Sequence, residues 1–275
     1  MSKPVIGCVP YLNATPLIAW FATPEGAHDA EVRFAAPSKL ADWLTDGTVD
    51  AILGSSFFAL VKPGSRCCAG VSISSFGPVE SVRLFSKLPI SEIQTVALDS
   101  SSLTSSHLAQ ILLAERYGVS ARAQFAPPVL ADMLATSDAC VLIGDAGMEA
   151  NASGLHVLDL GLEWHEMTGL PFVWALWIGG ERFSPALVET LNRAKAYGVE
   201  RVEQIARQQG PKRRFTESAA RRYLAEIIDF DLSASHLAGF SEYSRLCKVH
   251  GFIESDTLPE FVERVELANP VEPRN

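Results

Sequence analysis

The side chains in this sequence that are most able to take part in ligand binding or catalysis carry neutral hydroxyl and amide groups. Each group follows a short apolar segment, at 5–9, 49–53 or 95–98. Such segments are typical of strands whose carboxyl ends share one edge of an α/β sheet, where ligands bind. The unpaired N–H groups of a helix start, with hydroxyl donors beside them, suit a carboxylate ligand. The same residues also cap helices routinely, so both interpretations stay open. The side chains are Asn13, Ser55, Ser56, Ser102, Thr104 and Ser105.

Stronger enzyme motifs are absent from the sequence. There is no G-x-G-x-x-G, G-x-x-x-x-G-K-[ST], G-x-S-x-G or H-E-x-x-H pattern. The five cysteines form no C-x-x-C pair, and the six histidines are dispersed. His165 beside Glu166 is the nearest approach to an acid/base pair, although this pair is more typical of a solvated helix start. We therefore expect no metal and no cofactor.

Charge and hydropathy exclude other classes of partner. The 32 acidic and 23 basic side chains give a net charge of −9, which repels nucleic acid and anionic membrane surfaces. The strongest apolar run, 170–178, is too short to span a membrane. Prolines at 4, 10 and 16 interrupt any secretory segment, so we expect a cytoplasmic protein. Nothing in the sequence sets its oligomeric state.

The order of apolar and amphipathic segments predicts an α/β fold of parallel strands linked by helices. From 184 onward we expect three helical segments, at about 184–205, from 216 and at 233–250, and no strand. Thr15 is predicted to cap a helix whose first residue is Pro16. The pattern permits two consecutive domains or one discontinuous domain. The predicted strands are 5–9, 49–53, 81–86, 95–98, 121–125, 139–143, 157–160 and 172–178, with helices at 37–44, after 102 and at 127–134.

Five segments in this order resemble a known family. They run from Val9 to Leu17, Gly77 to Val82, Ser102 to Ser105, Ile143 to Asp145 and Thr168 to Val173. Together they are similar to the chorismate dehydratases of the futalosine pathway to menaquinone. Each motif is weak by itself, but five in the same order are fairly specific, and they cover most of 5–180.

The resemblance implies a two-lobed fold like that of the type II periplasmic solute-binding proteins, with a ligand cleft between the lobes. It favours the discontinuous layout. One lobe would hold residues 1–84 and 176–275, which include the helical C-terminal part, and the other would hold 85–175.

The activity implied is removal of water from chorismate, a small dianion, to give 3-[(1-carboxyvinyl)oxy]benzoate by a carbon–oxygen lyase without cofactor. Because the matched motifs hold no strong base, the substrate's enolpyruvyl carboxylate is a candidate proton acceptor, held by Asn13 and Ser81 as catalytic residues. Ser55, Ser56, Ser102, Thr104, Ser105, Gly144 and Asp145 would bind substrate.

Other interpretations of the cleft and of its charged residues remain. A non-catalytic carboxylate-binding protein would need the same cleft. The related 1,4-dihydroxy-6-naphthoate synthase usually begins with a Pro-Cys-Pro-Asn-Asp type of segment, where this chain has Pro10-Tyr11-Leu12-Asn13-Ala14. Asp145 is more suited to capping a helix or bonding a backbone amide than to donating a proton to the leaving hydroxyl, and Glu80 is expected to face solvent. Arg83 and Lys39 are candidates to neutralise a dianion.

Overall fold

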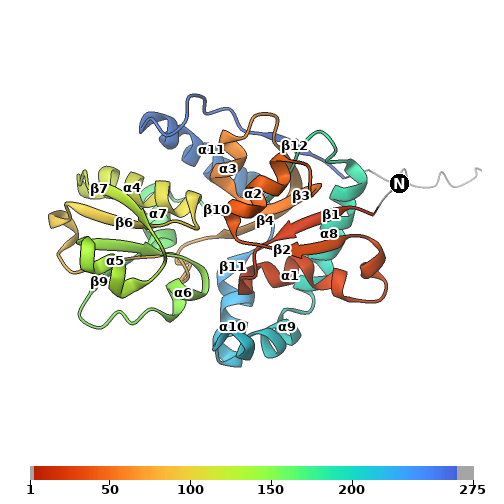
Figure 1. Ribbon diagram of the computed structural model, residues 1–275, viewed down its shortest axis with the longest axis horizontal. Coiled ribbons are helices and arrows are strands. Elements are labelled where there is room, and N and C mark those ends of the chain that lie inside the picture. The colour runs from red at the N-terminus through yellow and green to blue at the C-terminus, as the bar shows by residue number, and fades with distance from the viewer. Residues whose placement is uncertain (1–2, 265–275) are drawn as a thin grey trace, which may run out of the picture.

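The computed structural model describes residues 3–264, which form two β-sheets with helices around them (Figure 1). The first sheet has the order β11-β4-β10-β3-β1-β2, and β12 also pairs with β4. Its strands are β1 (Val5–Cys8), β2 (Glu31–Phe34), β3 (Ala51–Ser55), β4 (Arg66–Ser75), β10 (Phe172–Gly179), β11 (Ile228–Asp229) and β12 (Glu260–Val262).

The second sheet has the order β7-β6-β8-β5-β9 and is made of one continuous stretch of chain. It lies on the left of Figure 1, in yellow and green. Its strands are β5 (Arg83–Ser86), β6 (Thr95–Asp99), β7 (Arg122–Ala126), β8 (Ala139–Leu142) and β9 (His156–Asp159). The chain therefore enters this sheet after β4 and leaves it before β10. We keep lobe boundaries at 84/85 and 175/176 as a prediction; they fall within β5 and β10.

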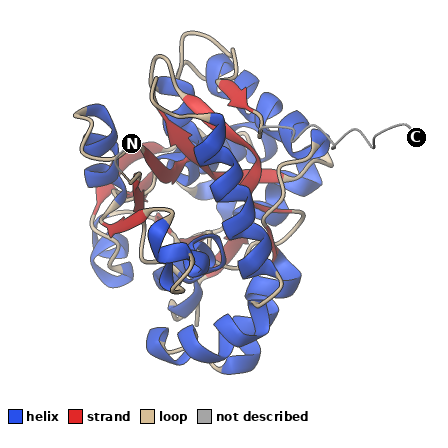
Figure 2. Cartoon of the chain, turned by 90° about the vertical axis from the view of Figure 1, so that its right-hand side faces the viewer, coloured by secondary structure: helices blue, strands red, loops and turns tan. Residues whose placement is uncertain are grey.

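Helices flank both sheets, as the quarter-turned view in Figure 2 also shows. They are α1 (Thr15–Ile18), α2 (Pro37–Thr45), α3 (Ser56–Val61), α4 (Leu103–Tyr117), α5 (Leu130–Thr136), α6 (Gly144–Glu149), α7 (Leu160–Thr168), α8 (Pro185–Val199), α9 (Val202–Gln209), α10 (Glu217–Arg222) and α11 (Ala234–Val249). A π-helical turn at Tyr223–Ile227 continues α10.

The expectation of parallel strands is wrong for part of each sheet. β10 runs antiparallel to β3 and β4, and β5 runs antiparallel to β8 and β9. An apolar strand has the same pattern in either direction, because direction depends on the end of the sheet at which the chain enters. Both strands are those by which the chain passes from one sheet to the other.

The helical C-terminal part also differs from the prediction. It contributes the short strands β11 and β12, which pair with β4 but are too short to leave an alternating pattern. The first predicted helix is two helices, because the chain leaves helical geometry at Arg201. The apolar spacing continues across the break because Val202 and Ile205 of α9 are also buried.

The start of α1 is a further correction. Thr15 is not its cap, because the chain enters the helix from a 3-10 turn at Leu12–Ala14, and Ala14 already has helical angles. No side chain is therefore needed to begin the helix. Asn13 lies within that turn, which follows β1 after a short connection at 9–11.

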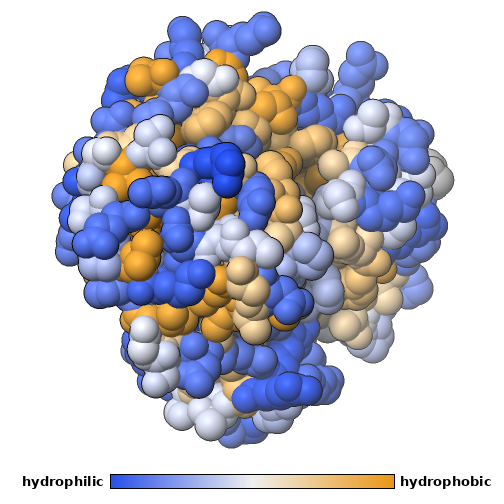
Figure 3. All heavy atoms as spheres, turned by 60° about the vertical axis from the view of Figure 1, so that its left-hand side comes forward, coloured by the Kyte–Doolittle hydropathy of each residue, from blue (hydrophilic) through white to orange (hydrophobic). Residues whose placement is uncertain are grey.

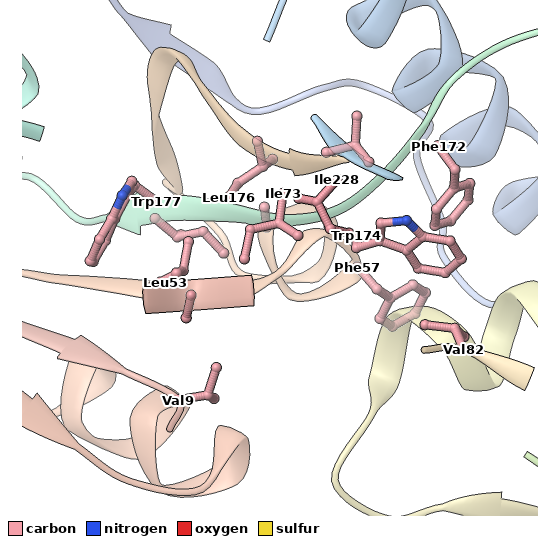
Figure 4. Packing of buried hydrophobic residues seen from close by; sticks show 14 of the residues in the cluster. Val9, Leu53, Phe57, Ile73, Val82, Phe172, Trp174, Leu176, Trp177 and Ile228 are labelled. Carbon is pink, nitrogen blue, oxygen red and sulfur yellow. The ribbon is translucent and has the colours of Figure 1, made fainter. Parts of the chain in front are cut away.

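The core centres on β10, whose Phe172, Trp174 and Trp177 are buried (Figure 4). The rings of Phe172 and Trp174 lie 4.3 Å apart, and the Trp174 indole donates a hydrogen bond to Ser75 Oγ at 3.0 Å. All five cysteines are buried and unpaired, as expected of small core residues. This packing fixes the strand against which the candidate site forms.

On the face shown in Figure 3, hydrophobic residues are interspersed among hydrophilic ones. Within 3–264, no helix has the length and apolarity required to cross a bilayer.

Gly198 of α8 allows the close approach of α1. A Cβ at this position would lie 1.8 Å from the carbonyl oxygen of Pro16, which neither backbone can accommodate without moving. We expect Gly198→Ala to lower the free energy of unfolding in urea by about 1–3 kcal/mol, despite the better helix propensity of alanine. Gly180→Ala, where a Cβ meets nothing within 4 Å, is the control and should change stability by less than about 0.5 kcal/mol. Equal effects at both positions would contradict this packing.

Candidate active site

A cavity with about 680 Å³ of space between atoms, part of it open to solvent, lies between the two sheets. Residues of both sheets line it, so neither sheet forms it alone. None of the described residues that line it is charged at neutral pH. They include Val9, Tyr11, Asn13, Ser55, Ile73, Val79, Ser81, Ser101, Ser102, Thr104, Ser105, Ile143, Gly144 and Trp174.

On one side of the cavity, Asn13 and Ser81 are joined through the hydroxyl of Tyr223. Asn13 Nδ2 donates to Tyr223 Oη at 3.1 Å, and Tyr223 Oη donates to Ser81 Oγ at 2.8 Å. Burial raises the pKa of Tyr223 well above its usual value, so the phenol stays protonated. Oδ1 of Asn13 is buried and has no hydrogen-bond partner. A buried carbonyl without a donor is costly, which makes this oxygen a candidate contact for a ligand.

The segment before Ser81 is held by a single carboxylate. Asp159, which caps α7 by accepting from Gly161 and Leu162, also accepts from the backbone N–H groups of Val79 and Glu80. Glu80 has a φ of 61°, a left-handed conformation that non-glycine residues seldom adopt. These bonds hold the chain in the tight turn that presents Ser81.

Glu80 adds a second attachment for this turn. Its carboxylate pairs with the guanidinium of Arg222, next to Tyr223 in the chain. Consecutive residues of the turn, Glu80 and Ser81, therefore contact consecutive residues of the C-terminal segment. The prediction that Glu80 faces solvent misses this ion pair, although the carboxylate is partly exposed.

On another side, the start of α4 contacts the end of β3 across the cleft. Thr104 Oγ1 lies 2.6 Å from Ser55 Oγ and accepts from the N–H of Phe57 at 3.2 Å. Ser102 caps α4 by accepting from the N–H of Ser105, and Ser55 caps α3 in the same way. These serines thus have the capping role that the sequence left open, while also lining the cavity.

A third side is formed by Gly144 and Tyr11. Gly144 has a φ of 58°, a left-handed conformation that suits glycine, and a Cβ there would be in ordinary van der Waals contact with the Tyr11 ring at 3.5 Å. Burial, partly offset by a hydrogen bond with Ser101, raises the pKa of Tyr11. Asp99 Oδ1 accepts from the N–H and Oγ of Ser101 at 2.8 and 2.6 Å.

The structure places Asn13, Ser55, Ser81, Ser102, Thr104, Ser105 and Gly144 around one cavity. Ser56 lies beneath it, where its hydroxyl donates to the carbonyl of Val173 at 2.7 Å. Asp145 lies outside the lining residues, 3.7 Å from Arg213, and burial raises its pKa above the ordinary value. Its hydrogen bond from the N–H of Leu12 agrees with the amide-binding alternative.

The predicted cations lie elsewhere. Arg83 donates to the carbonyl oxygens of Gly147 and Met148, and Lys39 does not line the cavity. Glu166 pairs with Arg116, and the His165 ring packs against Phe76, 4.2 Å away. In the described residues, no cluster of three or more His, Cys, Asp or Glu side chains could hold a metal ion.

Sequence reasoning missed Tyr223 and Trp174. Tyr223 belongs to the C-terminal part, where the motifs carry no family signal. A π-helical turn often marks a functional site, but it is invisible in sequence. Trp174 lies in the apolar run of β10 and reads as an ordinary core residue.

Comparison with known proteins shows the family of this chain. A family model described as menaquinone biosynthesis matches residues 4–249. The chain belongs to the menaquinone-biosynthesis family. It is 32% identical to a chorismate dehydratase of Thermus thermophilus over 222 residues, which are 74% of this chain and 80% of that protein. A chorismate dehydratase of Campylobacter jejuni is 25% identical, covering 89% of this chain and 97% of its own length.

Solved structures establish the fold of this family member. A protein of Archaeoglobus fulgidus superposes with a TM-score of 0.73 at 17% identity, covering 91% of this chain and 98% of its own. The periplasmic aliphatic sulphonate-binding protein of Escherichia coli gives a TM-score of 0.65 at 15% identity, covering 100% and 98%. The periplasmic-binding-protein-like fold implied by the family resemblance is therefore confirmed.

Thr104 provides a test of the contact across the cleft. Thr104→Val keeps the shape but leaves Ser55 Oγ and the N–H of Phe57 without this partner. We expect the free energy of unfolding to fall by about 1–3 kcal/mol. Small-angle X-ray scattering should show a more open particle. Thr190→Val, which removes an exposed hydroxyl bonded within α8, should change neither measurement. A Thr104→Val protein with wild-type stability and scattering would contradict the role of this contact.

The buried carboxyl group of Asp99 should make the stability of the folded protein depend on pH. Burial raises its pKa in the folded state above that in the unfolded chain, so the folded state holds its proton to higher pH. Stability therefore decreases as pH rises from the unfolded to the folded pKa. Asp99→Asn removes this titration, so we expect the stability of the variant relative to wild type to increase over that window. Urea unfolding from pH 3 upward measures it, and a constant or falling difference would contradict the shift.

Proposed function

We propose that this chain is a chorismate dehydratase, a carbon–oxygen lyase that removes water from chorismate to give 3-[(1-carboxyvinyl)oxy]benzoate. The observation that carries the proposal is the set of neutral donors around one uncharged cavity in a chain similar to chorismate dehydratases. The substrate is a small dianion, and neutral donors can hold its carboxylates while leaving them basic. Lysine or arginine beside the accepting carboxylate would lower its pKa instead.

The reaction requires that a proton leave the ring carbon that bears the enolpyruvyl ether. That hydrogen is vinylogous to the ring carboxylate, so the electron pair of the breaking C–H bond spreads into this carboxylate. We assign Ser102, Thr104, Ser105 and the start of α4 to the ring carboxylate, because a helix start stabilises developing negative charge. Ser55 and Ser56 contact the Thr104 hydroxyl of this wall, whereas Gly144 lies beside Tyr11 and Asp145 bonds the N–H of Leu12.

The proton acceptor in this proposal is the enolpyruvyl carboxylate of the substrate. None of the described residues that line the cavity is a histidine, lysine or carboxylate. Asn13 and Ser81 would hold the accepting group close to the C–H bond. A proton held there can then leave with the neighbouring hydroxyl as water, which restores the carboxylate and completes the aromatic ring. Closure of the two lobes excludes bulk water while charge develops.

The direct test is to mix chelator-treated protein with chorismate and to follow the mass and ultraviolet spectrum of the small molecule. We expect loss of one water and a benzoate-like spectrum. Asn13→Ala and Ser81→Ala should each lower kcat by about 100-fold, the usual effect of losing one preorganised hydrogen-bonding group. Asn151→Ala, at an exposed position, is the matched control and should retain full turnover.

Other outcomes would contradict the proposal. Unchanged chorismate, with a folded circular dichroism spectrum, would favour a carboxylate-binding protein, and calorimetry with chorismate would then measure its affinity. Turnover of the precursor of 1,4-dihydroxy-6-naphthoate instead of chorismate would favour the related synthase. Full activity of Asn13→Ala would remove the role assigned to that residue.

A further inference from the structure

The hydrogen bonds around Tyr223 have a fixed direction. A protonated phenol has one hydrogen to donate, and Tyr223 donates it to Ser81 Oγ. Its oxygen is therefore left to accept, and it accepts from Nδ2 of Asn13. The side chain of Tyr223 is buried, so water does not compete for either bond.

This direction determines what the cavity presents to a ligand. Asn13 lines the cavity, whereas Tyr223 does not. Because Nδ2 of Asn13 is turned toward Tyr223, its Oδ1 is the atom left to contact a ligand. That oxygen is buried without a partner. Ser81 Oγ already accepts a hydrogen bond from Tyr223, and its own hydroxyl hydrogen is free to be donated. Two residues bonded to one phenol oxygen thus offer one acceptor and one donor.

One acceptor with one donor complements a carboxylic acid better than a carboxylate. An ionised carboxylate only accepts, so it can bond Ser81 but meets repulsion from Oδ1 of Asn13. A protonated carboxyl accepts from Ser81 and donates to Asn13. Hydrogen bonding to the neutral form raises the basicity of such a group. The hydrogen bonding of Asn13 and Ser81 to this group therefore becomes stronger as the carboxylate takes up the proton. Interactions that strengthen toward the transition state lower the barrier of the reaction.

We propose that Tyr223 is a positioning residue that keeps Oδ1 of Asn13 toward the enolpyruvyl carboxyl group, so that the site favours this group in its protonated form. The inference rests on the proposed function. In the step concerned, the ring C–H bond breaks, its electron pair moves into the ring carboxylate, and an O–H bond forms on the enolpyruvyl carboxylate. Loss of the hydroxyl with that proton then releases water.

The attachment of Tyr223 suits a positioning role. It lies at the start of the π-helical turn, directly after Arg222, whose guanidinium pairs with Glu80 beside Ser81. The phenol is thus fixed relative to Ser81 by its neighbour as well as by its own bond. Asn13 is fixed independently, in the turn after β1.

The kinetic test is Tyr223→Phe. Without the phenol oxygen, the amide of Asn13 can turn its Nδ2 toward the substrate and stabilise the ionised carboxylate. We expect kcat to fall at least tenfold while KM stays equal or decreases. Tyr117→Phe, which removes a hydroxyl bonded to Glu163 away from the cavity, should leave both constants unchanged. Unchanged kcat for Tyr223→Phe, or a raised KM with unchanged kcat, would overturn the inference.

A double variant separates positioning from a general structural effect. If Tyr223 acts through Asn13, adding Tyr223→Phe to Asn13→Ala should change kcat less than twofold. A purely structural role would instead multiply the two losses, which would overturn the inference. Melting temperatures of all variants identify any that fail to fold.

A second readout does not depend on turnover. The side-chain amide signals of Asn13 in a ¹⁵N-¹H NMR spectrum can be assigned by their loss in Asn13→Ala. These amide hydrogens should exchange slowly with solvent in wild type and rapidly in Tyr223→Phe. Unchanged signals in Tyr223→Phe would overturn the positioning of Asn13. Absence of wild-type turnover of chorismate would instead overturn the proposed function, whatever the NMR result.

Discussion

The hydroxyl of Tyr223 is the point at which three distant parts of the chain meet. It bonds Asn13 from the turn after β1 and Ser81 from the segment that leads into the second sheet. The C-terminal segment that carries Tyr223 returns beside the first sheet and there holds both of these side chains. The site therefore depends on a buried hydrogen-bond network that leaves two groups for a ligand, Oδ1 of Asn13 and the hydroxyl hydrogen of Ser81.

Supporting bonds keep that network rigid. Asp159 accepts four backbone N–H groups and so joins the start of α7 to the turn that carries Ser81. A carboxylate with several such bonds is held in one orientation, and the turn tolerates the left-handed conformation of Glu80 because these bonds stabilise it. Thr104 performs the corresponding task across the cleft, where its hydroxyl contacts Ser55 and the start of α3. This contact across the cleft is thus made by neutral groups.

Neutrality of the cavity has consequences for its chemistry. The chain has a net charge of −9, yet no ionised residue lines the cavity among those described. Buried charges nearby, such as Asp99 and Asp145, are placed behind the wall, where burial raises their pKa. A dianionic ligand is consequently held by dipoles and single hydrogen bonds, which leave its carboxylates able to accept a proton. Such a site is sensitive to the direction of each hydrogen bond.

The sequence by itself determined the fold class, the family and the residue types of the site. Apolar segments followed by hydroxyl groups are local patterns, and strand β1, strand β3 with the hydroxyl groups after it, and α4 with its cap Ser102 lie where those patterns predict. The sequence did not predict the directions of the strands, the long strand β4, or the short strands β11 and β12. The partner with which a strand pairs is not encoded in any local sequence pattern. Only the tertiary structure decided that Tyr223 joins Asn13 to Ser81, that Asp145 and Ser56 lie outside the residues that line the cavity, and that Arg83 lies away from it. These assignments depend on contacts between segments up to 210 residues apart, which only the folded chain brings within hydrogen-bond distance.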